Sequence, residues 1–176
     1  MRPHLVLIGL PGAGKSTTGV LVARALGLPF RDLDTCIEAA EGRSVPELFA
    51  RDGEPAFRLL EQARMLELLV GPVSVIAAGG GWAVQPGNLA SVEGRARVVY
   101  LRIAPEVAAR RIAGTSHRPL LASGDPRVAL EALLQAREPS YLKADAIVDA
   151  DAPPEEVAAQ VVQVAMLRPG QPSGRT

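Results

Sequence analysis

The sequence predicts an α/β fold in which helices cover both faces of a parallel β-sheet. Two observations support this. Short apolar runs alternate along the chain with longer segments of helical periodicity. The first apolar run also passes through a glycine-rich turn directly into a helical segment, which is the order of a strand and helix in a βα unit. The chain has 176 residues and no internal repeat, so we expect one domain.

The apolar runs are the predicted strands. The second run, LPFRDLD, is expected to be extended, so that Asp32 and Asp34 point to the same face. Two carboxylates that close repel each other unless a cation or a proton donor faces them. The sequence therefore predicts a polar site beside this strand. The five predicted strands are 4–10, 28–34, 73–78, 97–103 and 146–150.

Helical periodicity predicts the helices between these strands. One helix follows the glycine-rich turn from about 16 to 26, and two or three helices occupy about 35 to 70. Pro105 and Pro153 suit first helical turns, so helices are expected to begin near them. A further helix follows a polar loop and is expected to end near Arg137. The polar tail, 169–176, is expected to be disordered.

Composition limits the partners of the chain. Nineteen basic and 19 acidic residues give a formal net charge of zero, which argues against nucleic acid or an anionic membrane as the main partner. The only cysteine, Cys36, cannot form an intramolecular disulfide. The N-terminal apolar run is too short for a signal peptide or a membrane span. We therefore expect a cytoplasmic protein.

The strongest motif is GLPGAGKST, Gly9 to Thr17, which matches the P-loop pattern between an apolar strand and a helix. Its glycines let the backbone turn tightly and bring N–H groups onto phosphate oxygens. Lys15 then reaches the β- and γ-phosphates, and the Ser16 hydroxyl ligates Mg²⁺. The sequence therefore predicts a site for ATP or GTP. Its expected nucleotide contacts are Gly12, Ala13, Gly14, Lys15, Ser16 and Thr17.

Three clusters follow the aspartate pair, and each has a purely structural explanation when taken alone. Glu54 and Arg58 fit an ion pair on a solvated helix face. The glycines Gly79 to Gly81 fit either a sharp turn or a backbone that a ligand approaches closely. The segment with Arg118 fits a surface loop.

Taken together and in this order, the motifs resemble the shikimate kinase family. The family pattern is a P-loop, then D-x-D, F-R-x-x-E, G-G-G, R-P-L-L and R-x-x-x-Y. Here it reads GLPGAGKST, DLD, FRLLE, GGG, RPLL and REPSY, and the resemblance covers the chain from His4 to about Ala165. It implies an enzyme that uses ATP and Mg²⁺ to phosphorylate the 3-hydroxyl of shikimate, in the pathway to chorismate and the aromatic amino acids.

The resemblance also implies a three-layer α/β/α fold of the nucleoside monophosphate kinase type, with a five-stranded parallel sheet in the order 2-3-1-4-5. It implies a single kinase domain over 1–168, with a substrate-binding helical region at about 33–61. A mobile lid is expected at about 113–125, with Gly114 and Gly124 as hinges. A monomer is the habit of the family.

Residue roles follow from the same resemblance. Arginines at the positions of Arg58 and Arg137 hold the substrate carboxylate, which suits the two-pronged guanidinium group. Glu61 orients Arg58, and the backbone of Gly79, Gly80 and Gly81 closes on the ring, Gly80 chiefly.

The phosphoryl-transfer groups are expected on the other side of the ring. Asp34 takes the proton of the acceptor hydroxyl, whereas Asp32 faces Mg²⁺ through a water. Lid residue Arg118 meets the charge of the transferring group and contacts both substrates. Arg111 and Pro154 lie at the positions that border the adenine in the family.

Two alternatives stay open at this stage. One is a P-loop kinase of another hydroxy acid, such as gluconate or quinate. The other is a nucleotide-binding module without catalysis, against which the joint presence of Asp34, Arg58, Arg118 and Arg137 argues. One departure is Trp82, the single tryptophan, where relatives more often carry a small residue. Since it follows the glycines, we expect its fluorescence to respond to shikimate.

Overall fold

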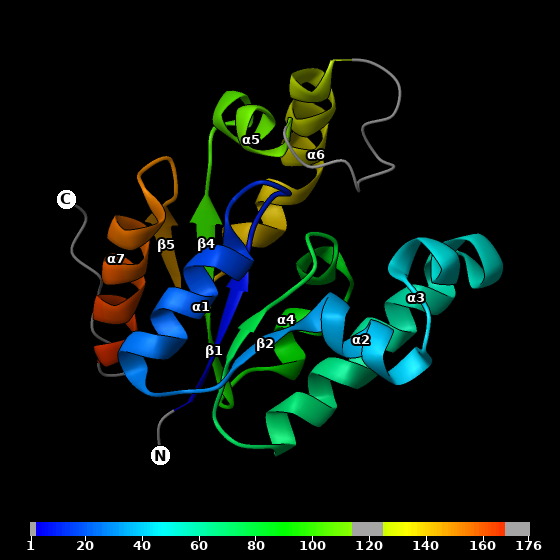
Figure 1. Ribbon diagram of the computed structural model, residues 1–176, viewed down its shortest axis with the longest axis horizontal. Coiled ribbons are helices and arrows are strands. Elements are labelled where there is room, and N and C mark those ends of the chain that lie inside the picture. The colour runs from blue at the N-terminus through cyan, green and yellow to red at the C-terminus, as the bar shows by residue number, and fades with distance from the viewer. Residues whose placement is uncertain (1–2, 114–124, 168–176) are drawn as a thin grey trace.

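The computed structural model describes residues 3–113 and 125–167. Five parallel strands form one sheet in the order β2-β3-β1-β4-β5, which confirms the predicted order (Figure 1). Every residue of the central strand β1 is buried, as expected for an apolar strand covered on both faces. The strands are β1 (His4–Ile8), β2 (Phe30–Asp32), β3 (Val75–Ala77), β4 (Ala96–Arg102) and β5 (Ala146–Asp149).

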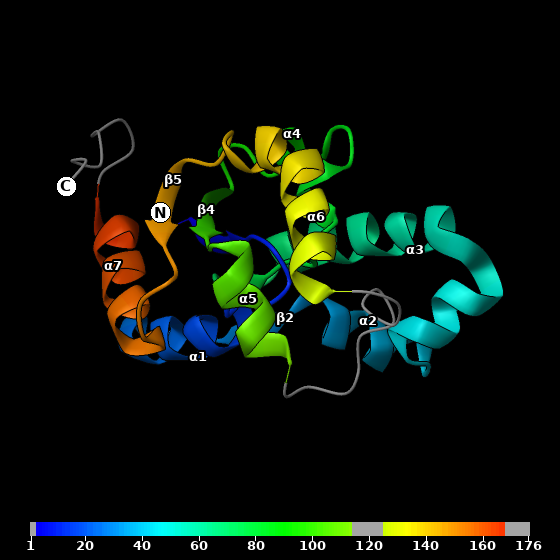
Figure 2. The same cartoon turned by 90° about the horizontal axis from the view of Figure 1, so that it is seen from above.

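Helices complete the three predicted layers. They are α1 (Lys15–Leu26), α2 (Leu33–Glu41), α3 (Val45–Val70), the 3₁₀ helix η1 (Trp82–Val84), α4 (Asn88–Ser91), α5 (Pro105–Ile112), α6 (Pro126–Tyr141) and α7 (Pro154–Met166). Helices α1 and α7 pack against each other on one face of the sheet, and α4 lies on the opposite face (Figure 2). Helix α5 packs against α6 beyond the carboxyl end of β4 (Figure 1).

The second strand is shorter than predicted. It ends at Asp32, and Asp34 lies in the first turn of α2. The side chain of Asp32 caps this helix by accepting hydrogen bonds from the backbone N–H groups of Asp34, at 3.1 Å, and Thr35, at 3.4 Å. The prediction that both carboxylates share one strand face is therefore wrong, because the capping preference of aspartate ends the strand between them.

One further boundary differs from the predictions and two short helices are additional, whereas the two or three helices expected over about 35 to 70 are present as α2 and a bent α3. Helix α6 does not end near Arg137 but continues through Pro139 to Tyr141. The long α3 is bent at Gly53, whose φ of 78° is left-handed, just before Pro55. The short helices η1 and α4 were not predicted, because three or four residues are too few to show periodicity.

Two predicted segments lie largely or wholly outside the described residues. They are the lid, including Gly114, Arg118 and Gly124, and the tail 169–176. Within the described ranges, no helix is long and apolar enough to cross a membrane.

Candidate active site

The P-loop joins β1 to α1 and is held down by close packing. Gly9, Gly12 and Gly14 have positive φ angles of 146°, 84° and 79°, which side chains rarely allow. A Cβ atom on Gly9 would lie 2.6 Å from the carbonyl oxygen of Leu101, and one on Gly12 would lie 2.8 Å from that of Ala108. These glycines therefore let the loop lie directly on β4 and α5.

The loop ends at the N-terminus of α1, where the helix begins with Lys15. The ammonium group of Lys15 donates hydrogen bonds to the carbonyl oxygens of Gly9 and Leu10, both at 3.0 Å. A cation thus lies over the loop, at the positive end of a helix. This arrangement suits a phosphate chain, which would exchange carbonyl oxygens for stronger anionic acceptors of the same ammonium group.

Ser16 and Asp32 form the candidate metal-binding pair. The Ser16 hydroxyl donates to Oδ2 of Asp32 at 2.6 Å, which joins the start of α1 to the end of β2. Both groups are hard oxygen ligands of the type that Mg²⁺ prefers. Residues 3–113 and 125–167 contain no cluster of three or more His, Cys, Asp or Glu side chains suited to a metal. The pair therefore fits an ion that keeps waters and phosphate oxygens as its other ligands.

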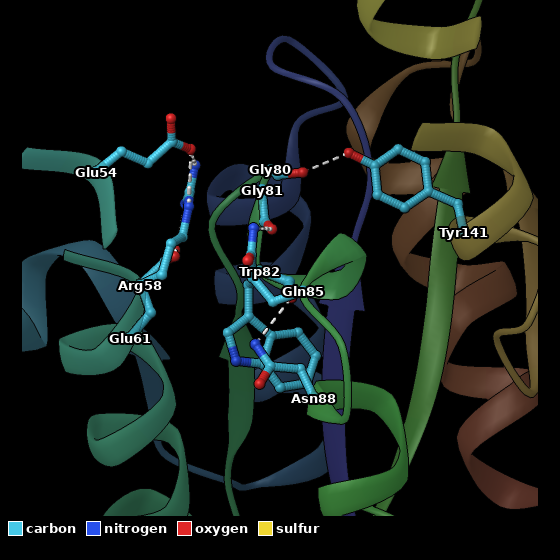
Figure 3. A network of polar contacts seen from close by, with 9 residues as sticks. All are labelled: Glu54, Arg58, Glu61, Gly80, Gly81, Trp82, Gln85, Asn88 and Tyr141. Atoms are coloured by element: carbon cyan, nitrogen blue, oxygen red, sulfur yellow. Dashed lines mark hydrogen bonds and ion pairs between the residues drawn. The ribbon is translucent and has the colours of Figure 1, made fainter. Parts of the chain in front are cut away.

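Arg58 of α3 is the centre of an ion-pair cluster (Figure 3). It pairs with Glu61 at 2.6 Å and with Glu54 at 2.7 Å. The ion pair between Glu54 and Arg58 that the sequence suggested is therefore present. Glu54 is exposed, but it contacts only one edge of a guanidinium group that is mostly buried. Burial acts to lower the pKa of Arg58, and the two carboxylates outweigh this and raise it.

Glu61 is completely buried, and its Oε1 has no hydrogen-bond partner among the described residues. Burial raises the pKa of Glu61, the ion pair with Arg58 opposes that rise, and the charge of Asp34 adds to it. The carboxylates of Glu61, on α3, and Asp34, on α2, thus lie near each other but differ in exposure. Such a difference in surroundings is typical of sites where one carboxylate positions and another exchanges protons.

The turn after β3 brings these groups together. A Cβ atom on Gly79 would lie 2.5 Å from Glu61 Oε1 and 3.2 Å from Asp34 Oδ1. On Gly80 it would lie 3.1 Å from Arg137 Nη1, and on Gly81 2.5 Å from Arg58 Nη2. None of the three glycines has a positive φ, so space rather than backbone conformation explains them. Charged side chains from α2, α3 and α6 approach this backbone closely.

The residues predicted to border the adenine, Arg111 and Pro154, lie on α5 and at the start of α7, away from the glycine turn. Arg111, in the last turn of α5, donates to the carbonyl oxygens of Ala152, at 3.0 Å, and Asp151, at 3.3 Å. Its guanidinium group is 3.9 Å from the Cβ position of Gly14. Pro154 begins α7 immediately after this segment. Arg111 therefore lies beside the loop that precedes α1 and connects it to the segment that precedes α7.

The structure thus groups the predicted residues in two neighbouring places, around the P-loop and around the glycine turn, apart from Arg118, which lies outside the described ranges. The sequence did not indicate two side chains that donate hydrogen bonds to backbone carbonyl oxygens at the glycine turn. Gln85 and Asn88 donate to the carbonyl oxygens of Gly81, at 3.4 Å, and Trp82, at 2.9 Å. Their only sequence signal is a position just after the glycines.

Comparisons with known proteins agree on one family. Residues 11–166 match the family model described as shikimate kinase. A shikimate kinase of Paracidovorax citrulli is 44% identical over 174 residues, which cover 94% of this chain and 95% of the relative. A solved shikimate kinase from Acinetobacter baumannii in complex with shikimate has a TM-score of 0.88 at 33% identity, over 93% of both chains. A gluconokinase from Sinorhizobium meliloti, at 20% identity and a TM-score of 0.66 over 93% of this chain and 91% of its own, shares the fold.

Proposed function

The chain belongs to the shikimate kinase family, and we propose that its P-loop and glycine turn transfer the γ-phosphoryl group of ATP to the 3-hydroxyl of shikimate. The observation that carries the proposal is the convergence of Arg58, Arg137 and Asp34 on the Gly79–Gly81 turn. In a hydroxy-acid substrate, the two cations would bind the carboxylate at one end, and the Asp34 carboxylate would accept the proton of the hydroxyl group at the other end. The P-loop, which follows the neighbouring strand β1, would bind ATP, the phosphoryl donor.

Arg58 and Arg137 bind the substrate carboxylate in this proposal. Glu61 holds one edge of Arg58 from the buried side, and this ion pair stays in place. The other edge pairs with Glu54, whose side chain is 60% exposed. An exposed pair is weak, so a substrate carboxylate displaces Glu54 at small cost and gains a guanidinium group that is already oriented.

Asp34 accepts the proton of the 3-hydroxyl as the oxygen attacks phosphorus. The reaction then forms one O–P bond and breaks the bond to ADP, and Asp34 later returns its proton to water. Lys15 neutralises the phosphate oxygens, and Arg118 of the lid is proposed to add a second cation. Mg²⁺, held beside Ser16 and Asp32, supplies further charge neutralisation at the β- and γ-phosphates when it is bound.

The test is a coupled assay of ADP release with ATP, Mg²⁺ and each of three acceptors, shikimate, quinate and gluconate. We expect shikimate to give the highest kcat/KM. We expect Lys15→Met and Asp34→Asn to lose on the order of 100-fold or more in kcat. Suitable controls are Lys143→Met, the only other lysine, and Asp52→Asn, an aspartate paired with Arg51 on α3.

Two outcomes would reject the assignment. Higher kcat/KM with gluconate or quinate would indicate another hydroxy-acid kinase of the same fold. ATP binding by calorimetry without turnover on any acceptor would indicate the nucleotide-binding module. Full activity in either Lys15→Met or Asp34→Asn would leave the family intact but overturn the roles given to these residues.

We also propose that the enzyme is a cytoplasmic monomer. The single Cys36 and the balanced charge support the cytoplasmic location, since neither an oxidising compartment nor a polyanionic partner is indicated. The monomer is what the resemblance to the family implies. Gel filtration with light scattering tests the monomer.

A further inference from the structure

The two tyrosines of the chain stack on each other behind the glycine turn. Tyr100 of β4 and Tyr141 of α6 have ring centroids 5.0 Å apart, and both side chains are fully buried. Their hydroxyl groups differ. That of Tyr141 donates to the carbonyl oxygen of Gly80 at 2.5 Å, whereas that of Tyr100 has no partner among the described residues. Only one member of the stack is therefore tied to the turn.

This hydrogen bond sets the direction of one peptide group. In a planar trans peptide, the carbonyl oxygen and the following N–H point in opposite directions. Figure 3 shows Tyr141 and Arg58 on opposite sides of the turn. Holding the Gly80 oxygen toward Tyr141 therefore directs the N–H of Gly81 toward the side of Arg58. Because both flanking residues are glycines, local sterics do little to fix this peptide.

The same hydroxyl group also interacts with Arg137. Tyr141 follows Arg137 by four residues, which is about one turn of α6 and places both on one face. Burial raises the pKa of Tyr141, and the positive charge of Arg137 opposes that rise. The guanidinium group of Arg137 in turn lies 3.1 Å from the Cβ position of Gly80. One hydroxyl thus joins a substrate-binding arginine to the substrate-binding turn.

We propose that Tyr141 is a positioning residue for the acceptor substrate, whose hydroxyl group aligns the Gly80–Gly81 peptide with Arg137. It acts through these groups and touches no reacting atom. Gln85 and Asn88 hold the next two carbonyl oxygens of the turn, but neither lies on the helix that carries Arg137. The inference rests on the proposed function, since it assigns Tyr141 to the acceptor half of that site.

The stack provides a matched pair of variants. Tyr141→Phe and Tyr100→Phe each remove one buried oxygen from the same pair of rings, and only the first removes the bond to Gly80. We expect Tyr141→Phe to raise KM for shikimate by roughly three- to tenfold, because one hydrogen bond that orders the acceptor site is lost. The expected kcat stays within about twofold and KM for ATP is unchanged. Tyr100→Phe is expected to leave all three constants unchanged.

A general packing defect would give a different pattern. An equal rise of KM for shikimate in both variants, a parallel rise of KM for ATP, or no rise in Tyr141→Phe would each overturn the proposal. Loss of shikimate-dependent ADP release in the unmodified enzyme would instead reject the proposed function itself.

A second measurement does not depend on the folding of Tyr141→Phe. Enzyme labelled with 3-fluorotyrosine carries the label at both tyrosines, which gives two ¹⁹F resonances. Tyr100→Phe identifies the resonance of Tyr141. We expect saturation with shikimate to shift the Tyr141 resonance more than that of Tyr100. Equal shifts, or no shift at either residue, would contradict a positioning role for Tyr141.

Discussion

Glu61 is fully buried, yet only its Oε2 atom has a hydrogen-bond partner among the described residues, Arg58 at 2.6 Å. Leaving a buried carboxylate half satisfied is costly. The proposed role of this carboxylate, which is to orient Arg58 beside Gly79, accounts for that cost. The cost should be visible in how stability depends on pH.

Burial raises the pKa of Glu61 above its ordinary value of 4.5, with the ion pair to Arg58 opposing the rise. The folded chain therefore holds this proton more tightly than the unfolded chain. The resulting stabilisation is present below pH 4.5 and is lost as pH rises through the raised pKa. We expect the free energy of unfolding of the wild type, minus that of Glu61→Gln, to fall as pH rises across this interval, measured by urea denaturation.

Glu67→Gln is the matched control for this prediction. Glu67 pairs with Arg64 on the same helix at the same spacing and distance, 2.6 Å, but its side chain is 63% exposed. A trend of equal size in this variant would trace the effect to helix charge and not to burial. A difference that increases with pH for Glu61→Gln would mean that the Arg58 ion pair outweighs burial.

At the scale of elements, the start of α2 combines two tasks in Asp32. Its Oδ1 caps the helix, and its Oδ2 accepts the hydrogen bond of Ser16. Asparagine caps helices about as well as aspartate but lacks the charge that attracts Mg²⁺. We expect Asp32→Asn to keep the thermal midpoint and to raise the Mg²⁺ concentration for half-maximal activity on the order of tenfold. Magnesium titrations of the coupled assay measure this.

Comparison with Asp32→Ala separates the two tasks. Alanine removes the cap as well as the charge, so this variant should destabilise the fold by about 1 kcal/mol, whereas Asp32→Asn should not. Asp34→Asn is expected to lower turnover even at saturating Mg²⁺. If excess Mg²⁺ restored Asp34→Asn but not Asp32→Asn, the roles of the two aspartates would have to be exchanged.

Elements with strong local signals followed from the sequence, and those decided by single contacts did not. The P-loop and the five strands are marked by glycines and continuous apolar runs, and their positions were predicted within a few residues. The end of β2 depends on one capping side chain, which a strand pattern does not show. The bond from Tyr141 to Gly80 joins residues 61 positions apart, so helical spacing alone could not reveal it.

At the scale of the whole molecule, two proposed half-sites lie at the carboxyl ends of the strands. The proposed nucleotide side comprises the P-loop, α5 and the start of α7, and the proposed acceptor side comprises α2, α3, α6 and the turn after β3. The family resemblance carried by the order of motifs implies most residues of both sides, and parallel strands bring the segments that carry them to one edge of the sheet. Side chains from distant helices complete each half, so the two are expected to bind independently.

Trp82 is expected to report on the proposed acceptor half, because it is the only tryptophan, fully buried and next to Gly81. We expect its fluorescence to change when shikimate is titrated into the wild type. The same change is expected in Lys15→Met, which keeps the acceptor half intact while turnover is lost. Arg58→Lys loses the two-pronged guanidinium group and is expected to weaken binding by about tenfold or more.

Arg64→Lys is the control for this titration, since Arg64 also pairs with a glutamate three residues later on α3 but does so on the exposed face. It should bind shikimate as the wild type does. A flat titration of the wild type at concentrations that saturate turnover would place the acceptor away from the glycine turn. A response lost in Lys15→Met would show that the halves are coupled, because the acceptor would then bind only where the phosphate-binding lysine is present.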